Sequence, residues 1–385
     1  MNPTLKPSSS FSLYMHLPWC KAKCPYCDFN SHATDRIPAE RYLAALLADL
    51  DRELPRIWGR RVQTIFIGGG TPSLFPPEII DRLLSEIRAR LRPLPGLEVT
   101  LEANPGAIEA ASFRAFRETG VTRLSLGIQS FSDVFLQRLG RIHDAAAARR
   151  AVELAIAAEF ESYNLDLMFA LPGQDLAAAR SDLQTALDYA PPHLSLYQLT
   201  LEAGTPFANH PPANLPDNDQ AADMENALRR QLHEAGLPRY EISAHALPDQ
   251  RCQHNRNYWL YGDYLGIGAG AHGKITLPEG IWRSRKPSRP ESYMADALSD
   301  ADAIGDYEPV LIADRPFEFM LNALRLTDGF PMALFPERTG LSWPMVQPQI
   351  RRAERDGLIE IKGESLQPTA LGLNFYNDLC ARFVP

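Results

Sequence analysis

The chain has 385 residues, of which 45% are hydrophobic and 22% are charged, and an acidic excess gives a formal net charge of −8. A chain of this length can form one large domain and a smaller one, and none of its apolar runs approaches the roughly 20 residues of a membrane span. The acidic balance and the lack of a long basic stripe argue against nucleic-acid binding. Residues 1–16 have no positively charged start followed by an apolar core, so we expect no secretory signal and a cytoplasmic protein.

The first 200 residues alternate between short apolar runs and longer amphipathic stretches. The strands that we expect cover residues 12–18, 62–68, 97–103, 122–129, 163–170 and 193–200. The helices that we expect cover residues 39–54, 77–91, 112–120, 144–160 and 176–190, where apolar residues recur every three or four positions. Strands that alternate with helices predict right-handed connections and a parallel sheet. A partial barrel of the TIM type and a doubly wound sheet are both consistent with this pattern.

Polar residues stand where these strands are expected to end. A cysteine-rich loop follows the first strand, and GGGTPS (68–73) follows the second. Glu102 closes the third strand, Gln129 closes the fourth, and Asp166 lies within the fifth, where an unpaired carboxylate would be costly. Because the carboxyl ends of parallel strands meet at one edge of a sheet or barrel, we expect these features to form one site.

The last part of the chain has a different pattern. Residues 251–273 are rich in aromatic residues and glycine, and from about residue 308 short helical patterns lead to an expected hairpin over residues 358–369. That order is similar to a winged helix, but it lacks a basic recognition helix, which favours a lid or docking module. We therefore divide the chain into a larger unit, residues 1–305, and a winged-helix-like α+β module, residues 306–385.

Three of the five cysteines, Cys20, Cys24 and Cys27, fall within eight residues. In a cytoplasmic protein such a cluster is expected to bind a metal. A structural zinc site needs four ligands, and His16 or His32 could complete a Cys₃His set. Three thiolates also suit a [4Fe–4S] cluster, in which the fourth iron stays open to an outside ligand.

The spacing Cys20-x₃-Cys24-x₂-Cys27, with the aromatic Tyr26 before the third cysteine, resembles the signature of the radical S-adenosylmethionine (SAM) enzymes. The resemblance implies that the methionine end of SAM chelates the open iron. It also implies that an electron from the cluster cleaves SAM to give a 5′-deoxyadenosyl radical. Of the two architectures left open above, it implies the partial (β/α)₆ TIM-like barrel.

Further motifs extend the resemblance over most of the chain: YMHLPWCKAKCPYCDF, FIGGGTPS, LEANPG, LSLGIQSF, the RIH of LGRIHD, and LDLMFALPGQ. They resemble the subfamily of oxygen-independent coproporphyrinogen III oxidase and the HemW-type heme chaperones. The resemblance places Tyr14 beside SAM, a glycine-rich turn at its methionine end, and Asp166 at its ribose hydroxyls. The SAM-site residues that it implies are Tyr14, Gly69, Gly70, Thr71, Glu102, Gln129, Arg141 and Asp166.

Two features separate the two kinds of relative. The oxidase has a fourth cysteine where this chain has Phe29, and HemW-type proteins carry a motif HNxxYW that is intact here at residues 254–259. The resemblance therefore implies a heme chaperone, which binds heme and passes it to an acceptor protein, together with an electron donor for the cluster. The candidate heme-binding residues are His254, Asn255, Tyr258 and Trp259.

Two other functions stay open at this point. The first is the decarboxylating oxidase, and the second is a radical SAM enzyme that modifies another substrate. Cys252 is a further candidate iron ligand, and His272 has no evident role. The sequence leaves open whether SAM is cleaved or only bound, and hence whether the protein is an enzyme.

Overall fold

The computed structural model describes residues 5–106, 110–300 and 303–385, and none of the helices within these ranges is long and apolar enough to cross a membrane. The first residues of the segment that we inspected for a secretory signal, and residues 107–109 and 301–302, lie outside the described residues.

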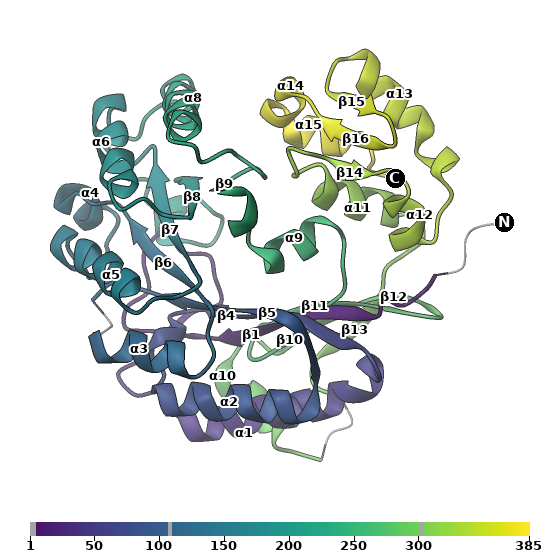
Figure 1. Cartoon of the computed structure of the whole chain (residues 1–385), viewed down its shortest axis with the longest axis horizontal. Helices are drawn as coiled ribbons and strands as arrows, with labels where there is room; N and C mark the ends of the chain where they lie inside the picture. The colour runs from purple at the N-terminus through teal and green to yellow at the C-terminus, as the bar shows by residue number, and fades with distance from the viewer. Residues whose placement is uncertain (1–4, 107–109, 301–302) are drawn as a thin grey trace.

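One mixed sheet dominates the described part of the chain, with the strand order β13-β12-β11-β10-β1-β4-β5-β6-β7-β8-β9. Its central strands are parallel to one another: β1 (Ser10–Leu17), β4 (Arg61–Gly69), β5 (Arg92–Ala103), β6 (Arg123–Gln129), β7 (Ser162–Phe169) and β8 (His193–Gln198). These are the six strands that the sequence predicted. The sheet curves from β1 to β8 and stays open, as a partial barrel does (Figure 1).

Shorter strands extend the sheet at both edges. β10 (Tyr264–Ile267) pairs in parallel with β1, on the side away from β4. The antiparallel strands β11 (His272–Leu277), β12 (Gly280–Arg285) and β13 (Asp306–Pro309) follow it, and β9 (Ala244–Ala246) pairs antiparallel with β8. A separate short pair, β2 (Trp19–Cys20) and β3 (His32–Ala33), brackets the cysteine loop.

Helices cover the outer face of the sheet, and the helices expected over the first 200 residues form. The helices of the larger unit are α1 (Ala39–Glu53), α2 (Pro77–Arg90), α3 (Ala110–Glu118), α4 (Asp133–Arg138), α5 (Ala145–Ala157), α6 (Leu176–Leu187), α7 (Pro206–Asn209), α8 (Asn218–Glu234), α9 (Gln253–Trp259) and α10 (Pro290–Ala297). Asp144 caps α5 as predicted, since its side chain accepts a hydrogen bond from the Ala147 backbone N–H at 2.8 Å. α9 lies apart from the outer layer, between the sheet and the C-terminal helices (Figure 1).

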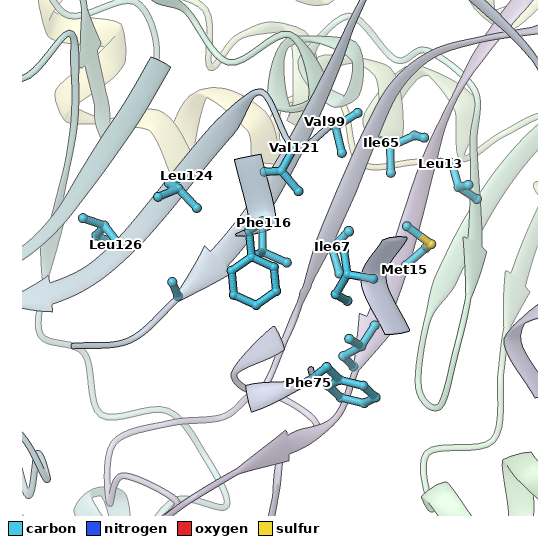
Figure 2. Close-up of a cluster of buried hydrophobic side chains, with 14 of the residues drawn as sticks. Leu13, Met15, Ile65, Ile67, Phe75, Val99, Phe116, Val121, Leu124 and Leu126 are labelled. Carbon is cyan, nitrogen blue, oxygen red and sulfur yellow. The ribbon is translucent and has the colours of Figure 1, made fainter. Parts of the chain in front are cut away.

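The central strands have an apolar outer face and a polar inner face. Because successive side chains of a strand point to opposite faces, alternate residues meet the helices and form the main core. Figure 2 shows part of this core, and its labelled residues are Leu13, Met15, Ile65, Ile67, Phe75, Val99, Phe116, Val121, Leu124 and Leu126. The intervening positions carry residues such as Tyr14, Glu102, Ser125 and Asp166. The barrel interior is therefore lined by groups that can bind a polar ligand.

The C-terminal module has its own hydrophobic core, which includes Phe319, Phe335, Ile350 and Leu366. Its elements are α11 (Arg315–Ala323), β14 (Phe330–Pro331), α12 (Leu334–Thr339), α13 (Gln347–Arg355), β15 (Ile359–Lys362), β16 (Ser365–Pro368), α14 (Ala370–Asn374) and α15 (Tyr376–Ala381). The expected hairpin forms as the pair β15–β16, and β14 pairs with β16. The main sheet extends past our division at residue 305, because β13 pairs with β12.

Candidate functional site

The three clustered cysteines line one small cavity at the carboxyl ends of the central strands. This cysteine cavity has a volume of about 150 Å³, and Gly69, Gly70, Glu102, Gln129 and Arg141 also line it. Residues from β4, β5, β6 and β7 thus converge there, as predicted from the strand ends.

Each cysteine has a different hydrogen-bonding partner. Thr71 Oγ1 donates to Cys20 Sγ at 3.6 Å, Arg141 Nη1 donates to Cys24 Sγ at 3.5 Å, and Ser31 Oγ lies 3.8 Å from Cys27 Sγ. Donors of this kind stabilise thiolates and orient them, as the outer shell of a metal site does.

Asn104 joins two of these donors. Its side-chain oxygen accepts from Arg141 Nη2 at 2.7 Å, and its amide donates to Thr71 Oγ1 at 2.7 Å. Asn104 was absent from the site residues that the sequence analysis assigned. Its place in LEANPG, two residues after Glu102, is the signal that could have included it.

The histidines near the loop have other partners. His16 Nδ1 is hydrogen bonded to the Tyr14 hydroxyl at 2.9 Å and Nε2 to the Asn30 carbonyl oxygen at 2.8 Å, while His32 Nε2 contacts Asn30 Oδ1 at 3.2 Å. Across the described residues, no three His, Cys, Asp or Glu side chains gather around one point as ligands of a single metal ion. Both ring nitrogens of His16 are engaged, so His16 is a poor fourth ligand for the alternative Cys₃His zinc site.

The glycine-rich turn is packed too closely to accept side chains. Gly69 has φ +118°, and a Cβ atom there would lie 2.7 Å from the His16 ring. A Cβ atom on Gly70 would lie 2.4 Å from the Trp19 carbonyl oxygen. Glycine at both positions therefore lets the turn close against β1 and the cysteine loop, at the edge of the cysteine cavity.

Two carboxyl groups face the interior beside this turn. Removal from bulk water raises the pKa of Glu102 to about 7, although the Gly69 backbone N–H donates to its Oε2 at 3.0 Å. Removal from water also raises the pKa of Asp166, and donation from Asn164 (2.8 Å) and Ser125 (3.2 Å) opposes the shift. Asp166 thus has the partners that the sequence analysis required.

Gln129 has a strained backbone with φ +68°, which is uncommon for a residue with a side chain. It lies where β6 ends, and its side chain lines both the cysteine cavity and a second cavity in the barrel interior. This barrel cavity has a volume of about 400 Å³, and Glu102, Arg123, Asp166 and His193 line it. The two cavities share Tyr26, Cys27, Phe29, Glu102, Ser125, Gln129 and Asp166.

The HNxxYW motif forms most of α9 and faces two cavities. Asn255 lines the barrel cavity, whereas Tyr258 and Trp259 line a third, larger cavity of about 630 Å³. We call this third one the outer cavity, and its further lining includes Tyr14, Phe29, Tyr264, His272 and, from α11, Asn322. Tyr14 lies on the outer cavity and not on the cysteine cavity. The predicted heme-binding residues therefore do not all face one space.

His254 is buried behind the outer cavity, and both of its ring nitrogens have partners. Nδ1 is bonded to Thr64 Oγ1 at 2.8 Å, and Nε2 is bonded to the Tyr258 hydroxyl at 2.9 Å. Burial and the charge of Arg123 lower the pKa of His254 to about 3, so the ring is neutral. Its direct role as a heme ligand stays a prediction, and in this arrangement it holds Tyr258 in place.

Trp259 and Cys252 have different surroundings. The Arg325 guanidinium, from the C-terminal module, stacks on the Trp259 ring at 4.2 Å from its centroid, so Trp259 joins the two units. Cys252 is fully buried beside Glu98, and burial raises the pKa of its thiol to about 12. Cys252 lines none of the three cavities.

An open parallel barrel with three cysteines at its carboxyl edge, facing a polar interior, defines a radical SAM protein. The model of the radical SAM superfamily matches residues 14–186, and that of the HemN C-terminal domain matches residues 313–375. The solved structure of coproporphyrinogen III oxidase (HemN) from Escherichia coli superposes with a TM-score of 0.82 over 97% of this chain and 90% of that chain, at 22% identity. This likeness confirms the fold class.

Sequence relatives narrow the class. The protein is 45% identical to the heme chaperone HemW of Escherichia coli (strain K12), over 97% of this chain and 98% of the relative. It is 46% identical to the heme chaperone HemW of Haemophilus influenzae, over 99% of both chains. The chain therefore belongs to the HemW family within the radical SAM superfamily, and membership in that superfamily implies a [4Fe–4S] cluster and SAM.

Proposed function

We propose that the protein is a heme chaperone, which binds heme and transfers it to an acceptor protein. The outer cavity is the observation that carries this proposal. Aromatic rings from separate segments, Tyr14, Phe29, Tyr258, Trp259 and Tyr264, line it, and its volume is in the range of small-molecule sites. Aromatic faces pack well against a flat macrocycle. The HemW relatives, named heme chaperones, support the same function.

The described residues fit a three-cysteine cluster. Cys20, Cys24 and Cys27 would each hold one iron, since each thiol has its own hydrogen-bonding partner and lines the common cavity. When bound, such a cluster supplies an electron to SAM. Arg141 orients Cys24, and through Asn104 it fixes the hydroxyl that donates to Cys20. A separate electron donor is part of the proposal.

SAM would occupy the space between the cysteines and the strand ends. Gly69 and Gly70 line this space where the methionine end is proposed to lie, and Asp166 offers carboxylate oxygens for the ribose hydroxyls. The other proposed SAM residues are Tyr14, Thr71, Glu102, Gln129 and Arg141. Of these, Tyr14 lines the outer cavity, which shares Gly69 and Glu102 with the cysteine cavity. A cytoplasmic location remains a prediction.

Phe29 argues for chaperone over oxidase. It stands where the decarboxylating oxidase has its fourth cysteine, its side chain is 61% exposed, and it lines all three cavities. An aromatic ring at this junction gives the outer cavity an apolar wall that adjoins the cysteines. The proposed heme would then lie next to the cluster site, and Phe29 would separate the two.

Titration with ferric heme, followed by transfer to apomyoglobin as a test acceptor, examines this function directly. We expect a shifted Soret band on binding and a myoglobin spectrum after the acceptor is added. The same preparation, supplied with cluster, reductant and SAM, should leave coproporphyrinogen III unchanged. Decarboxylation without heme affinity would return the protein to the oxidase class. Neither activity would favour a radical SAM enzyme for another substrate, whose ligand the barrel cavity would hold.

A further inference from the structure

The histidines close to the outer cavity differ in whether their ring nitrogens are free. His16 lines the cavity but is bonded through Nδ1 to Tyr14 and through Nε2 to Asn30. His254 lies behind the cavity wall and is bonded through Nδ1 to Thr64 and through Nε2 to Tyr258. His272 lines the cavity with an exposed side chain, and neither of its nitrogens has a hydrogen-bonding partner among the described residues.

The backbone of His272 is held firmly although its ring is free. It is the first residue of β11 and pairs with Arg285 of β12. The turn before it is closed by a hydrogen bond from the Ala271 N–H to the Gly268 carbonyl oxygen at 3.0 Å. Gly266 of β10 packs so closely that a Cβ atom there would lie 2.0 Å from the His272 carbonyl oxygen. The backbone is therefore fixed at the cavity wall, and both ring nitrogens of His272 are available to a ligand.

We propose that His272 binds the heme iron in the outer cavity through one of its ring nitrogens. This inference rests on the proposed heme-chaperone function and assigns the iron contact within that site. The neutral imidazole is the form that binds iron.

The position of His272 also suits release. A ligand in the buried core, such as His254, could exchange only after the wall of the cavity opened. His272 is exposed at the outer cavity, so the ligand of an acceptor protein could displace it while Tyr258 and Trp259 still hold the porphyrin face. The aromatic residues would then provide most of the affinity, and His272 would determine the coordination state of the iron.

The experiment compares His272→Ala with His233→Ala, a matched change at an exposed position of α8 that lines none of the three cavities. Ferric heme is the probe, and absorption and electron paramagnetic resonance spectra are recorded. For His272→Ala we expect the spectrum of histidine-ligated heme to be replaced by that of heme without a histidine ligand. The dissociation constant for heme should rise about tenfold. Added imidazole should restore the parent spectrum in this variant. His233→Ala should match the parent.

A second substitution, His272→Gln, keeps a polar side chain of similar size and should therefore disturb folding less. For both variants, the iron content of the reconstituted cysteine loop shows whether the protein is folded. A parent-like heme spectrum in either His272 variant would overturn the iron assignment and leave the chaperone proposal standing. An equal spectral change in His233→Ala would also overturn it. A parent protein that binds no heme would instead defeat the proposed function itself, and the assignment with it.

Discussion

The cysteine cavity and the outer cavity are built in different ways. The first collects side chains from the ends of β4 to β7, where the same repeating strand-and-helix unit delivers one polar residue after another. The second shares Gly69 and Glu102 with the first, but most of its lining comes from β1, the cysteine loop, α9, β10, β11 and α11, which no single repeat connects. A site on a repeating scaffold can be read from periodicity, whereas a site between units depends on how those units pack.

The difference predicts that the two cavities can be disabled separately, and the cysteines should show the largest effect. Replacing Cys20, Cys24 and Cys27 together by Ala removes every protein thiolate from the cysteine cavity. Iron in the reconstituted protein should fall from about four atoms per chain to background, with loss of the thiolate-to-iron absorption. Heme binding should persist.

Cys380→Ala is the matched control, because Cys380 is a thiol in the core of the C-terminal module. Its iron content should equal that of the parent. Iron retained by the triple variant, or zinc bound in its place by the parent after expression with ample iron, would contradict the cluster assignment.

A single substitution should weaken the binding of SAM and leave both the cluster and heme binding intact. Asp166→Asn removes a carboxylate that lines both the cysteine cavity and the barrel cavity and accepts hydrogen bonds from Asn164 and Ser125. We expect SAM binding to lose roughly 1–3 kcal/mol, since a buried charged acceptor is lost. Calorimetry on the reconstituted protein measures it. Asp188→Asn, on the exposed end of α6, is the control, and parent-like affinity in Asp166→Asn would show that the ribose lies elsewhere.

Much of the fold and of the cysteine cavity followed from the sequence for a physical reason. Apolar residues on the outer face alternate with polar residues on the inner face, so strand position alone assigned Glu102, Gln129 and Asp166 to one edge. Strand position is no guide where packing between units decides. The candidate heme-binding residues of HNxxYW line different cavities, because α9 turns Asn255 into the barrel cavity and Tyr258 into the outer cavity. No local pattern places His272 or Asn322 beside them.

Trp259 provides the reciprocal test on the outer cavity. Trp259→Ala removes an aromatic surface and the ring on which Arg325 stacks. The dissociation constant for heme should rise about five- to thirtyfold, equivalent to roughly 1–2 kcal/mol. Iron content should stay at the parent level. Trp58→Ala is the control, because Trp58 is 83% exposed and does not line the outer cavity, and it should change neither heme binding nor iron content. Loss of iron with intact heme binding in Trp259→Ala would reverse our assignment of the two cavities.

The smallest expected effect is a change with pH in the free energy of unfolding of the cluster-free protein, caused by the ionisation of Glu102. It tests whether this carboxyl group is enclosed as the geometry indicates. Its pKa in the folded protein is about 7, above the ordinary value of 4.5, so folding favours the protonated form. That contribution is fully present below pH 4.5 and is lost as the pH rises through 7. Between pH 6 and pH 8 the free energy of unfolding should therefore fall by about 1 kcal/mol from this group.

Glu102→Gln cannot ionise and should lack that component in urea unfolding curves, whereas Glu118→Gln, at an exposed position of α3, should keep it. A Glu102→Gln protein with the parent's pH profile would mean that water reaches Glu102 freely and that its carboxyl group is not enclosed.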